Sequence, residues 1–575
     1  MKNTQYADWL DIDSDKLFFW HHLPKKNIGK TAVIIIGPIG PEYMPSHRST
    51  RLLARKIVET GINCIRYDPI GMGNSSGCLQ DTLIWDKWVK TPNHITSYLK
   101  DNFNIDKIIF IAVRSGCLVL TDIKVDIKID SAIFWYPQTN GSKYIRGIQL
   151  LDSVLYQNTS YSKNGILEGG GYPFTKELQN KIRDIDLTSL DIQNISNVLI
   201  IDDATTDNQS KLSSIISATN AKIESVKLDG LEDMVKQVTL SKIPQSNIIY
   251  IINWLNNNHD ANSYNTSNKL TSNYNYITSN FIESTLSIDA DKNMFGILTK
   301  PKNKDSKKVV IFPNTGAAHH AGPNRIHVDA SRVLANEGTS TLRFDLSNLG
   351  ESTENYTIDP PQEFPATAAN DINTVINYSI NELGYNEIIL CGISAGAHNV
   401  FHAALESVSH KITLLILINP DTFYWNPNQS IHSEVSTKTE VDKEYYKKQI
   451  LNFDKWLILL TSPKKLINTS LFLTRFILKI IKIISNKCLR LLNISIIGTL
   501  EKDIQKLASS GIKINLIYSK GDPGYSILMS QASSTLNQLK KEQKYTSIQI
   551  SYGDHTFSSI ASRKKLYKAL ASATS

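Results

Sequence analysis

The feature that most constrains the fold of this 575-residue chain is an internal repeat. In both halves a glycine precedes an aspartate at the same spacing, over residues 61–68 and 338–345, and IRYD in the first half answers LRFD in the second. Residues 225–234 (SVKLDGLEDM) align without gaps against residues 547–556 (SIQISYGDHT). A single hydrophobic core rarely serves a chain of this length, so the repeat predicts two like domains in tandem.

Each half alternates short apolar segments with helix-compatible ones. In the first half we expect strands at 16–23, 31–37, 62–68, 107–113, 132–136 and 198–202, and a helix at 47–61. The order recurs in the second half, with strands at 307–313, 339–345, 387–392, 412–418 and 514–519 and a helix at 327–338. Strands that alternate with helices predict an α/β fold in which a mostly parallel, doubly wound sheet has helices on both faces.

A polar tract rich in Asn and Ser occupies residues 257–275 and contains almost nothing to bury. We interpret it as a linker between a first domain at 1–256 and a second domain at 276–575. Both halves carry a longer insertion, which in the second half lies between the expected strands 412–418 and 514–519. The insertion of the second half, at about 421–511, is predicted to be helical and to form a lid.

In the second half, the apolar strand IILC leads directly into the pattern GxSxG, which is formed by Gly392, Ser394 and Gly396. Glycine two residues before and after the serine lets a strand and a helix approach at a tight turn, with the serine exposed at its tip. The pattern also occurs by chance in glycine-softened loops, but here a helix-compatible segment, AHNVFHAALES, follows it. Ser394 is therefore the predicted nucleophile.

A serine hydroxyl attacks efficiently only with a base in hydrogen-bond reach and a carboxylate that orients the base. Asp522 follows the strand INLIYS, and His555 follows the last expected strand. Taken alone, Asp522 could simply cap a helix and His555 could be an ordinary surface residue. Their order after Ser394 and their positions at strand ends together predict a catalytic triad. Asp345 and Asp554 are expected to brace loops.

Negative charge that develops on the substrate carbonyl oxygen requires positioned N–H donors. One expected donor is the backbone of Ala395, and the second comes from the loop after strand 307–313, at Gly316 or Ala317. His319 and His320 follow in the same loop. They either contact substrate or, as we favour, brace the loop.

The repeat places Arg114 where Ser394 stands and Asp233 where His555 stands. A guanidinium cannot attack a carbonyl, so the first domain is predicted to be catalytically silent. A shift by one residue would present Ser115 instead, but the turn would then end on a cysteine rather than a glycine. Arg114 either contacts an anion, such as a phosphate or carboxylate, or pairs with carboxylates of its own domain.

Within the second insertion, SLFLTRFILKIIKIISNKCLRLL places Arg475, Lys479 and Lys482 on one helical face. A basic amphipathic helix serves either as a lid packed over the active site or as a helix lying on a membrane surface. If these cations face outward, they predict an anionic partner, which would be an acidic acyl carrier protein or a phospholipid surface.

The composition argues against several functions. The net charge of +8 and the 41% hydrophobic content are ordinary for a soluble protein with a mildly basic surface. Lys and Arg are scattered, without zinc-finger spacing or an RNA-binding aromatic pattern, which argues against nucleic acid. The absence of HExxH and of Cys/His clusters predicts no metal, and no cofactor is expected. Five cysteines without motif spacing and the lack of an apolar leader predict a cytoplasmic protein, either free or peripheral to the membrane.

The second half, through NTGAAHHAGPNRIHVDASRVLANEG, LRFDLSNLGES, GISAG and GDHTF, resembles the α/β-hydrolases, and within them the serine aminopeptidase-like branch that includes exosortase-associated hydrolases. The first half, through GPIGPEYMPSHRSTRLLARKI, IRYDPIGMGNSSG and FWYPQTNGSKYI, resembles a related branch in which arginine often occupies the elbow. The resemblance implies hydrolase or acyltransferase chemistry at Ser394, Asp522 and His555. It also implies a link to acyl carrier proteins and acyl-activating ligases.

We therefore expect a serine hydrolase or acyltransferase that acts on an ester or thioester through an acyl-enzyme on Ser394. The alternative is a binding or scaffold protein for an acyl carrier protein or a lipid-linked substrate, in which both halves have lost turnover. The Ser, His and Asp set of the second half favours the enzyme.

Overall fold

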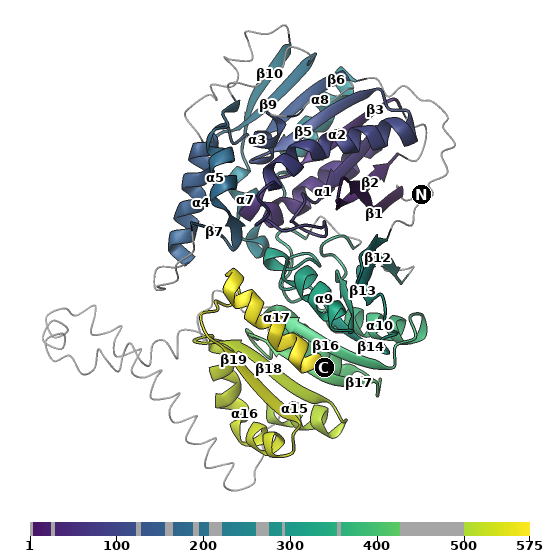
Figure 1. The fold of residues 1–575 in the computed structure, drawn as a ribbon, viewed down its shortest axis with the longest axis vertical. Coiled ribbons are helices and arrows are strands. Elements are labelled where there is room, and N and C mark those ends of the chain that lie inside the picture. The colour runs from purple at the N-terminus through teal and green to yellow at the C-terminus, as the bar shows by residue number, and fades with distance from the viewer. Residues whose placement is uncertain are drawn as a thin grey trace, which may run out of the picture.

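The computed structural model describes residues 4–24, 29–121, 123, 128–155, 165–187, 195–205, 221–259, 275–289, 294–352, 358–425 and 500–575. These residues form two large sheets, one above the other in Figure 1, and a short two-stranded ribbon. Each large sheet is built from one half of the chain, so each half folds around its own sheet.

The first sheet has eight strands in the order β1-β2-β4-β3-β5-β6-β9-β10. β1 and β2 run antiparallel to each other, β2 runs antiparallel to β4, and the strands from β4 onward are parallel. The strands are β1 (Thr4–Ile12), β2 (Asp15–Leu23), β3 (Thr31–Ile36), β4 (Asn63–Tyr67), β5 (Lys107–Val113), β6 (Lys128–Trp135), β9 (Asn197–Asp203) and β10 (Lys222–Leu228). The separate ribbon pairs β7 (Leu167–Gly169) with β8 (Tyr172–Phe174).

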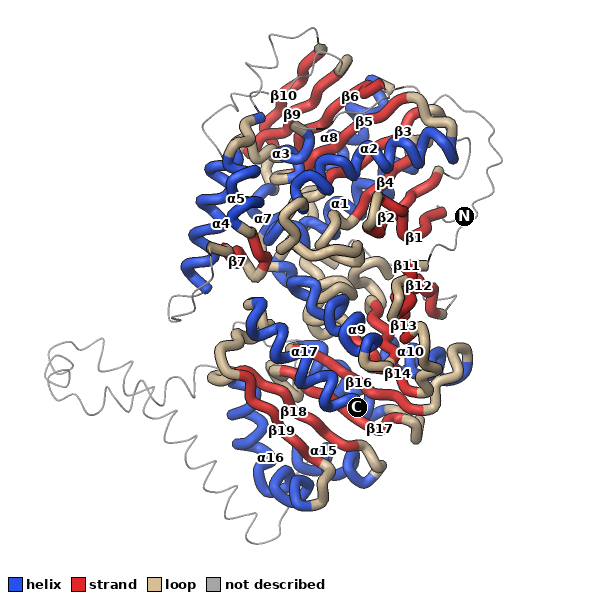
Figure 2. Tube along the Cα trace, in the orientation of Figure 1, coloured by secondary structure: helices blue, strands red, loops and turns tan. Residues whose placement is uncertain are grey.

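Helices cover both faces of this sheet, as Figure 2 shows. One face packs against α1 (Tyr43–Glu59), α7 (Leu231–Val235) and α8 (Gln245–Asn258). The other packs against α2 (Ile84–Phe103), α3 (Gly116–Leu120), α4 (Gly141–Leu155) and α5 (Lys176–Arg183). Two short 3-10 helices, η1 (Gly40–Glu42) and η3 (Val238–Leu240), lie in the connections.

The second sheet repeats this order with one short strand added at its edge, β11-β12-β13-β15-β14-β16-β17-β18-β19. β11 to β13 and β15 are antiparallel neighbours, and the remaining pairs are parallel. The strands are β11 (Tyr276–Ile277), β12 (Phe281–Ile288), β13 (Met294–Pro301), β14 (Lys308–Phe312), β15 (Ser340–Phe344), β16 (Glu387–Ile393), β17 (Ile412–Ile418), β18 (Lys513–Ser519) and β19 (Tyr545–Ile550).

The helices of the second half repeat the arrangement as well. α9 (Ile326–Asn336) and α17 (Ile560–Thr574) cover one face. α10 (Ala368–Asn381), α11 (Ala395–Glu406), α15 (Leu500–Ser509) and α16 (Pro523–Lys541) cover the other, and η4 (Pro323–Arg325) precedes α9. The chain therefore has the predicted α/β class, with two α/β-hydrolase folds in tandem.

Several elements differ from the sequence prediction, and β12 and β13 are two strands that it did not include. β1 was not predicted, because its acidic residues interrupt the apolar alternation, although Trp9 in it is only 1% exposed. α8 continues through Asn258, two residues into the segment interpreted as a linker, since a polar helix end is hard to tell from a loop by composition. The rest of that linker, residues 260–274, and the predicted basic helix with Arg475, Lys479 and Lys482 lie outside the described residues, so the domain boundaries and the lid stay predictions.

The two halves meet through a mixed apolar and charged junction. Trp9, Phe18 and Trp20 of the first half pack with Phe295 and Ile297 of the second in one buried cluster. Beside it, the carboxylate of Glu351 lies 2.5 Å from the Arg66 guanidinium, 3.2 Å from that of Arg51 and 2.7 Å from the imidazole of His47. Since Glu351 belongs to the second half and its three partners to the first, this junction is a buried ion network.

Candidate active site

The predicted nucleophile lies at a strained turn between β16 and α11. Ser394 has φ 57° and ψ −125°, a backbone conformation that a non-glycine residue adopts only when its surroundings enforce it. A Cβ at Gly396 would come 2.7 Å from the carbonyl oxygen of Asn314, so the loop after β14 lies directly against the turn. The glycine of the pattern is therefore required by close packing.

The structure brings Ser394, His555 and Asp522 together. His555 Nε2 is 2.9 Å from Ser394 Oγ, and His555 Nδ1 is 2.6 Å from Asp522 Oδ2. The other carboxylate oxygen of Asp522 accepts from the backbone N–H of Gly524 at 2.9 Å, so this residue both caps α16 and orients the imidazole. Asn419 donates to the carbonyl of His555 at 2.7 Å and fixes the loop that carries it.

Asp421 is a fourth member of the site that the sequence analysis missed. Ser394 Oγ donates to its Oδ2 at 2.7 Å, and its Oδ1 is 3.1 Å from His555 Nε2. Asp421 follows β17, the neighbour of β16 in the sheet. The carboxyl ends of adjacent parallel strands lie at the same sheet edge, and this is the signal that could have identified it.

The charges of the site act on each other strongly. Burial lowers the pKa of His555, but the hydrogen bonds to Asp421 and Asp522 outweigh burial and raise that pKa to about 10. For Asp421, burial raises the pKa, yet the hydrogen bond to His555 brings it below its usual range. Burial and the nearby charge of Asp421 raise the pKa of Glu363 to about 7. The resting imidazole is thus held in its charged form.

The expected oxyanion donors lie on elements that meet at Ser394. Ala395 is the first residue of α11, and Gly316, with φ 54°, and Ala317 lie in the loop between β14 and η4. A Cβ at Gly316 would come 3.4 Å from Glu363 and 3.6 Å from Thr239 of the first half. The first half therefore reaches the loop beside the site.

The histidines of that loop face the junction between the halves. His320 pairs through Nδ1 with Asp345 at 2.7 Å, and its Nε2 is 3.0 Å from Asn74 of the first half. The ring of His319 is 4.5 Å from the ring of His47. Asp345 also accepts from the His320 backbone, as expected of a loop brace. Asp554 accepts from the Ser558 backbone at 2.6 Å.

Arg114 pairs with a carboxylate of its own half, which is the second of the two roles predicted for it. Its guanidinium lies 2.8 Å from the Glu42 carboxylate and donates to the carbonyl of Tyr136 at 3.0 Å. The side chain is thus held by a carboxylate and a backbone oxygen of its own half. Ser115 does not take the elbow position, because its Oγ accepts from the Ile39 backbone at 3.0 Å and is buried.

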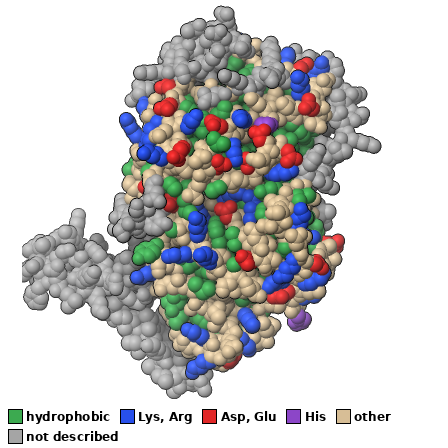
Figure 3. All heavy atoms as spheres, viewed as in Figure 1, with side chains coloured by type: hydrophobic (Ala, Val, Ile, Leu, Met, Phe, Trp, Pro, Cys, Tyr) green, Lys and Arg blue, Asp and Glu red, His purple; other side chains and the backbone are tan. Residues whose placement is uncertain are grey.

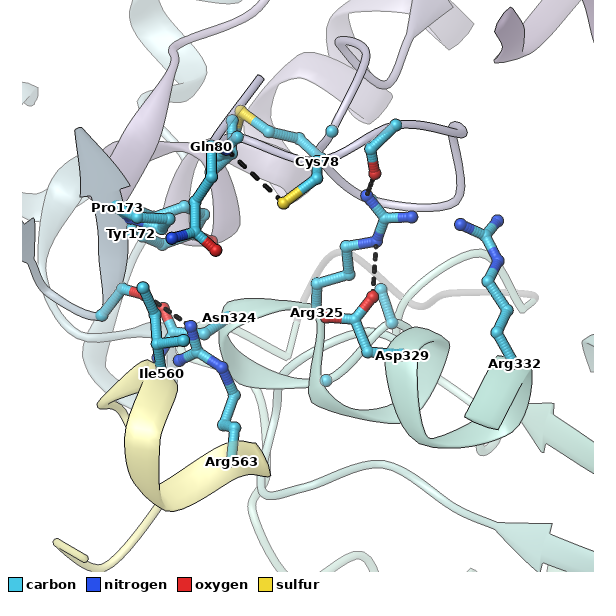
Figure 4. A pocket seen from close by; sticks show the side chains of 18 of the residues that line it. Cys78, Gln80, Tyr172, Pro173, Asn324, Arg325, Asp329, Arg332, Ile560 and Arg563 are labelled. Atoms are coloured by element: carbon cyan, nitrogen blue, oxygen red, sulfur yellow. Dashed lines mark hydrogen bonds and ion pairs between the residues drawn. The ribbon is translucent and has the colours of Figure 1, made fainter. Parts of the chain in front are cut away.

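A cavity of about 420 Å³ lies between the halves, away from Ser394 and His555, which do not line it. Figure 4 shows Cys78, Gln80 and Tyr172 of the first half across from Arg325 and Arg563 of the second. Arg325 donates to the carbonyls of Ser75 and Gly77, and Arg563 to that of Gly171 at 3.0 Å. These arginines hold the two halves together around the cavity.

On the face drawn in Figure 3, acidic and basic side chains are intermingled over the first half.

No family model matches the chain, and no curated protein matches it. Solved structures that are similar to it match about half of the chain, and three serve as examples. An alpha-beta serine hydrolase homologue from Coxiella burnetii is 12% identical, covers 54% of this chain and 100% of its own, and has a TM-score of 0.29. Est1E from Butyrivibrio proteoclasticus is 15% identical, with coverages of 44% and 98% and a TM-score of 0.32. GrgF from Penicillium sp. sh18, an alpha/beta hydrolase, is 15% identical, with coverages of 45% and 99% and a TM-score of 0.33. Likeness at this level assigns no activity.

Two further observations concern the described ranges alone. No helix in them combines the length and the apolar character needed to cross a membrane. No three His, Cys, Asp or Glu side chains in them come together as metal ligands.

Proposed function

We propose that the second half is a serine hydrolase or acyltransferase that acts on an ester or thioester through an acyl-enzyme on Ser394. The observation that carries the proposal is the pair of contacts that His555 makes, through Nε2 with Ser394 Oγ at 2.9 Å and through Nδ1 with Asp522 at 2.6 Å. A nucleophile, a base and an orienting carboxylate in this geometry are what acyl transfer requires.

In this mechanism, neutral His555 takes the proton of Ser394 Oγ as the oxygen attacks the acyl carbonyl. The N–H groups of Ala395 and of Gly316 or Ala317 stabilise the oxyanion of the tetrahedral intermediate. The intermediate collapses as His555 gives the proton to the leaving alcohol or thiol, which leaves the acyl group on Ser394. Water or another alcohol or amine then loses a proton to His555 and attacks the acyl-enzyme, and His555 passes that proton to the leaving Ser394 Oγ.

The resemblance to exosortase-associated hydrolases supports an acyl group delivered by an acyl carrier protein or held on a lipid, and this partner is part of the proposal. The competing function is a scaffold that binds such a partner without turnover. The intimate contact of Ser394 with His555 favours the enzyme, because a scaffold has no need of a base 2.9 Å from a serine.

The deciding experiment treats the full-length protein with a fluorophosphonate probe. We expect labelling of wild type and of Ser115→Ala, and none of Ser394→Ala. Since Ser115 is buried and bonded to Ile39, it is the matched control from the other half. Failure of wild type to react at any pH up to about 10, where His555 becomes neutral, would leave the scaffold as the function.

A further inference from the structure

Asp421 occupies a position that a plain Ser-His-Asp relay does not need. Its two oxygens contact the two reacting atoms, Oδ2 with Ser394 Oγ at 2.7 Å and Oδ1 with His555 Nε2 at 3.1 Å. The orienting role is already filled, because Asp522 holds the opposite ring nitrogen. Asp421 therefore lies on the substrate side of the imidazole.

The chemistry of the reaction determines which part of the substrate comes close to Asp421. His555 Nε2 gives its proton to the leaving group and later takes one from the acceptor, so both heteroatoms must come within hydrogen-bond reach of Nε2. Asp421 is already within that reach. The alcohol or amine part of the substrate, rather than the acyl chain, is therefore the part that meets Asp421.

The site also carries excess negative charge. Asp421 and Asp522 share one imidazolium, that of His555, which is the only positive group that the described residues place against them. Glu363 adds a third carboxyl group. It has no hydrogen-bond or ion-pair partner among the described residues, and it faces Gly316, where a Cβ would lie 3.4 Å from its Oε1.

A stacked aromatic pair fixes the two segments that bring these acids together. The rings of Phe364 and Trp425 are 4.7 Å apart at 19°, and Phe364 also contacts the ring of His398 at 5.0 Å. Phe364 follows Glu363 directly, and Trp425 lies four residues after Asp421. The aromatic contact thus holds the segments of Glu363 and Asp421 together, and the face of an aromatic ring attracts an organic cation.

We propose that Asp421, supported by Glu363, makes this site selective for esters or acyl acceptors whose alcohol or amine part carries a positive charge. The inference rests on the proposed function and adds the substrate class to it. An ammonium group that pairs with Asp421 draws the carboxylate away from Ser394 Oγ and His555 Nε2. Ser394 then donates its hydrogen bond to His555, and the imidazole is free to act as the base.

The test compares the hydrolysis of three esters, two of butyrate and one of glycine, at equal concentration and low salt. Choline butyrate carries the charge on the alcohol, 3,3-dimethylbutyl butyrate is its neutral isostere, and the 3,3-dimethylbutyl ester of glycine carries the charge on the acyl group. For wild type we expect kcat/KM for the choline ester to exceed that for each of the other two by about 10-fold or more. Asp421→Asn should abolish this preference and raise turnover of the neutral ester, whereas Asp305→Asn, which removes an exposed carboxylate near Lys307, should retain the preference.

Equal rates on the choline ester and its isostere in wild type would overturn the inference, and so would a preference that survives in Asp421→Asn. A preference for the glycine ester would place the cation on the acyl side and equally overturn it. These outcomes are distinct from failure of the proposed function, because fluorophosphonate labelling of Ser394 is read out on the same samples. Labelled protein without the preference refutes only the selectivity, and unlabelled protein refutes the nucleophile.

Discussion

Arg114 directly follows β5 and Ser394 directly follows β16, and the two residues share a left-handed φ, 52° and 57°. In both turns the glycine two residues after the tip is required by packing, because a Cβ at Gly116 would lie 2.6 Å from the Gly37 oxygen and one at Gly396 would lie 2.7 Å from the Asn314 oxygen. The two turns therefore share a backbone conformation and differ in the side chain at the tip, a guanidinium in the first half and a hydroxyl in the second.

The electrostatics of the two halves differ in a matching way. Arg114 is neutralised by Glu42 of its own half, and Asp233, where the base would stand, pairs with Lys236 at 2.7 Å near the surface. Ser394 and His555 instead lie among carboxylates that hold the imidazole charged. The first half thus pairs these charges within itself, whereas the second half leaves more carboxylates than cations around His555.

The first half contacts the segment that follows His555 in the second half. In the ribbon β7–β8, buried Glu168 accepts from the Ile560 backbone at 2.9 Å, and Gly171 accepts from Arg563 at 3.0 Å. Ile560 begins α17, just after the loop of His555. The first half therefore braces the end of the loop that carries His555.

The largest expected effect follows from the elbow comparison. Ser394→Ala and His555→Ala should each lower turnover of an activated ester on the order of 10⁴-fold or more, because a single missing member disables the relay. Arg114→Ala should leave turnover within a factor of about two. A steady-state activity assay measures all three variants, and circular dichroism verifies that each of them is folded. Near-wild-type turnover in Ser394→Ala would show that the reaction uses another nucleophile.

A second prediction asks whether the halves unfold as one unit. Glu351→Ala leaves Arg51 and Arg66 without their buried carboxylate, which costs about 3–5 kcal/mol of unfolding free energy. Glu59→Ala, which breaks an exposed pair with Lys56, should cost about 1 kcal/mol or less. Urea unfolding monitored by Trp fluorescence gives both values. Two separate transitions, of which neither moves in Glu351→Ala, would mean that the junction contributes nothing to either half.

The sequence could predict these elements to different degrees. The strands, the elbow and the alignment of Arg114 with Ser394 were predictable, because each depends on a local pattern or on the repeat. Asp421 was not, because a lone Pro-Asp after a strand has no motif and its role depends on the order of β17 in the sheet. The contact of Glu168 with Ile560 spans most of the chain and rests on how two sheets pack, which no local pattern encodes.

The brace from the first half gives a third prediction. Glu168→Gln weakens the acceptor for the Ile560 backbone and should lower kcat about 10-fold through misplacement of the His555 loop, with KM changed less than about two-fold. Glu177→Gln, on the exposed start of α5, is the matched control and should behave as wild type. The split between kcat and KM at an unchanged melting temperature identifies a positioning role. A loss of stability with kcat unaltered would reduce Glu168 to an ordinary structural residue.

A fourth prediction concerns pH. The base must be neutral, and the hydrogen bonds to Asp421 and Asp522 raise the pKa of His555 to about 10 against burial. The kcat/KM for a neutral ester should therefore rise with pH between 7 and 10. Asp421→Asn removes one carboxylate, lowers the pKa of His555 and moves this rise to lower pH. The stability from the charged imidazole is fully present below about 6.5 and is lost as pH rises through about 10. A profile that is flat from pH 7 to 10 in both proteins would show that His555 is not the base.

The smallest expected effect concerns the basic helix predicted in the second insertion. Replacing Arg475, Lys479 and Lys482 together with Gln should weaken carrier-dependent turnover, or binding to vesicles that contain anionic lipid, by a few-fold at low salt. Hydrolysis of a small neutral ester should not change, because that substrate meets no acidic partner. The difference between variant and wild type should vanish in about 0.5 M NaCl, where charges separated by more than a few ångströms are screened. An equal loss on the small ester would mean that these side chains pack over Ser394 as a lid, and the asymmetry between the halves would then lie in shielding the reaction rather than in recruiting a partner.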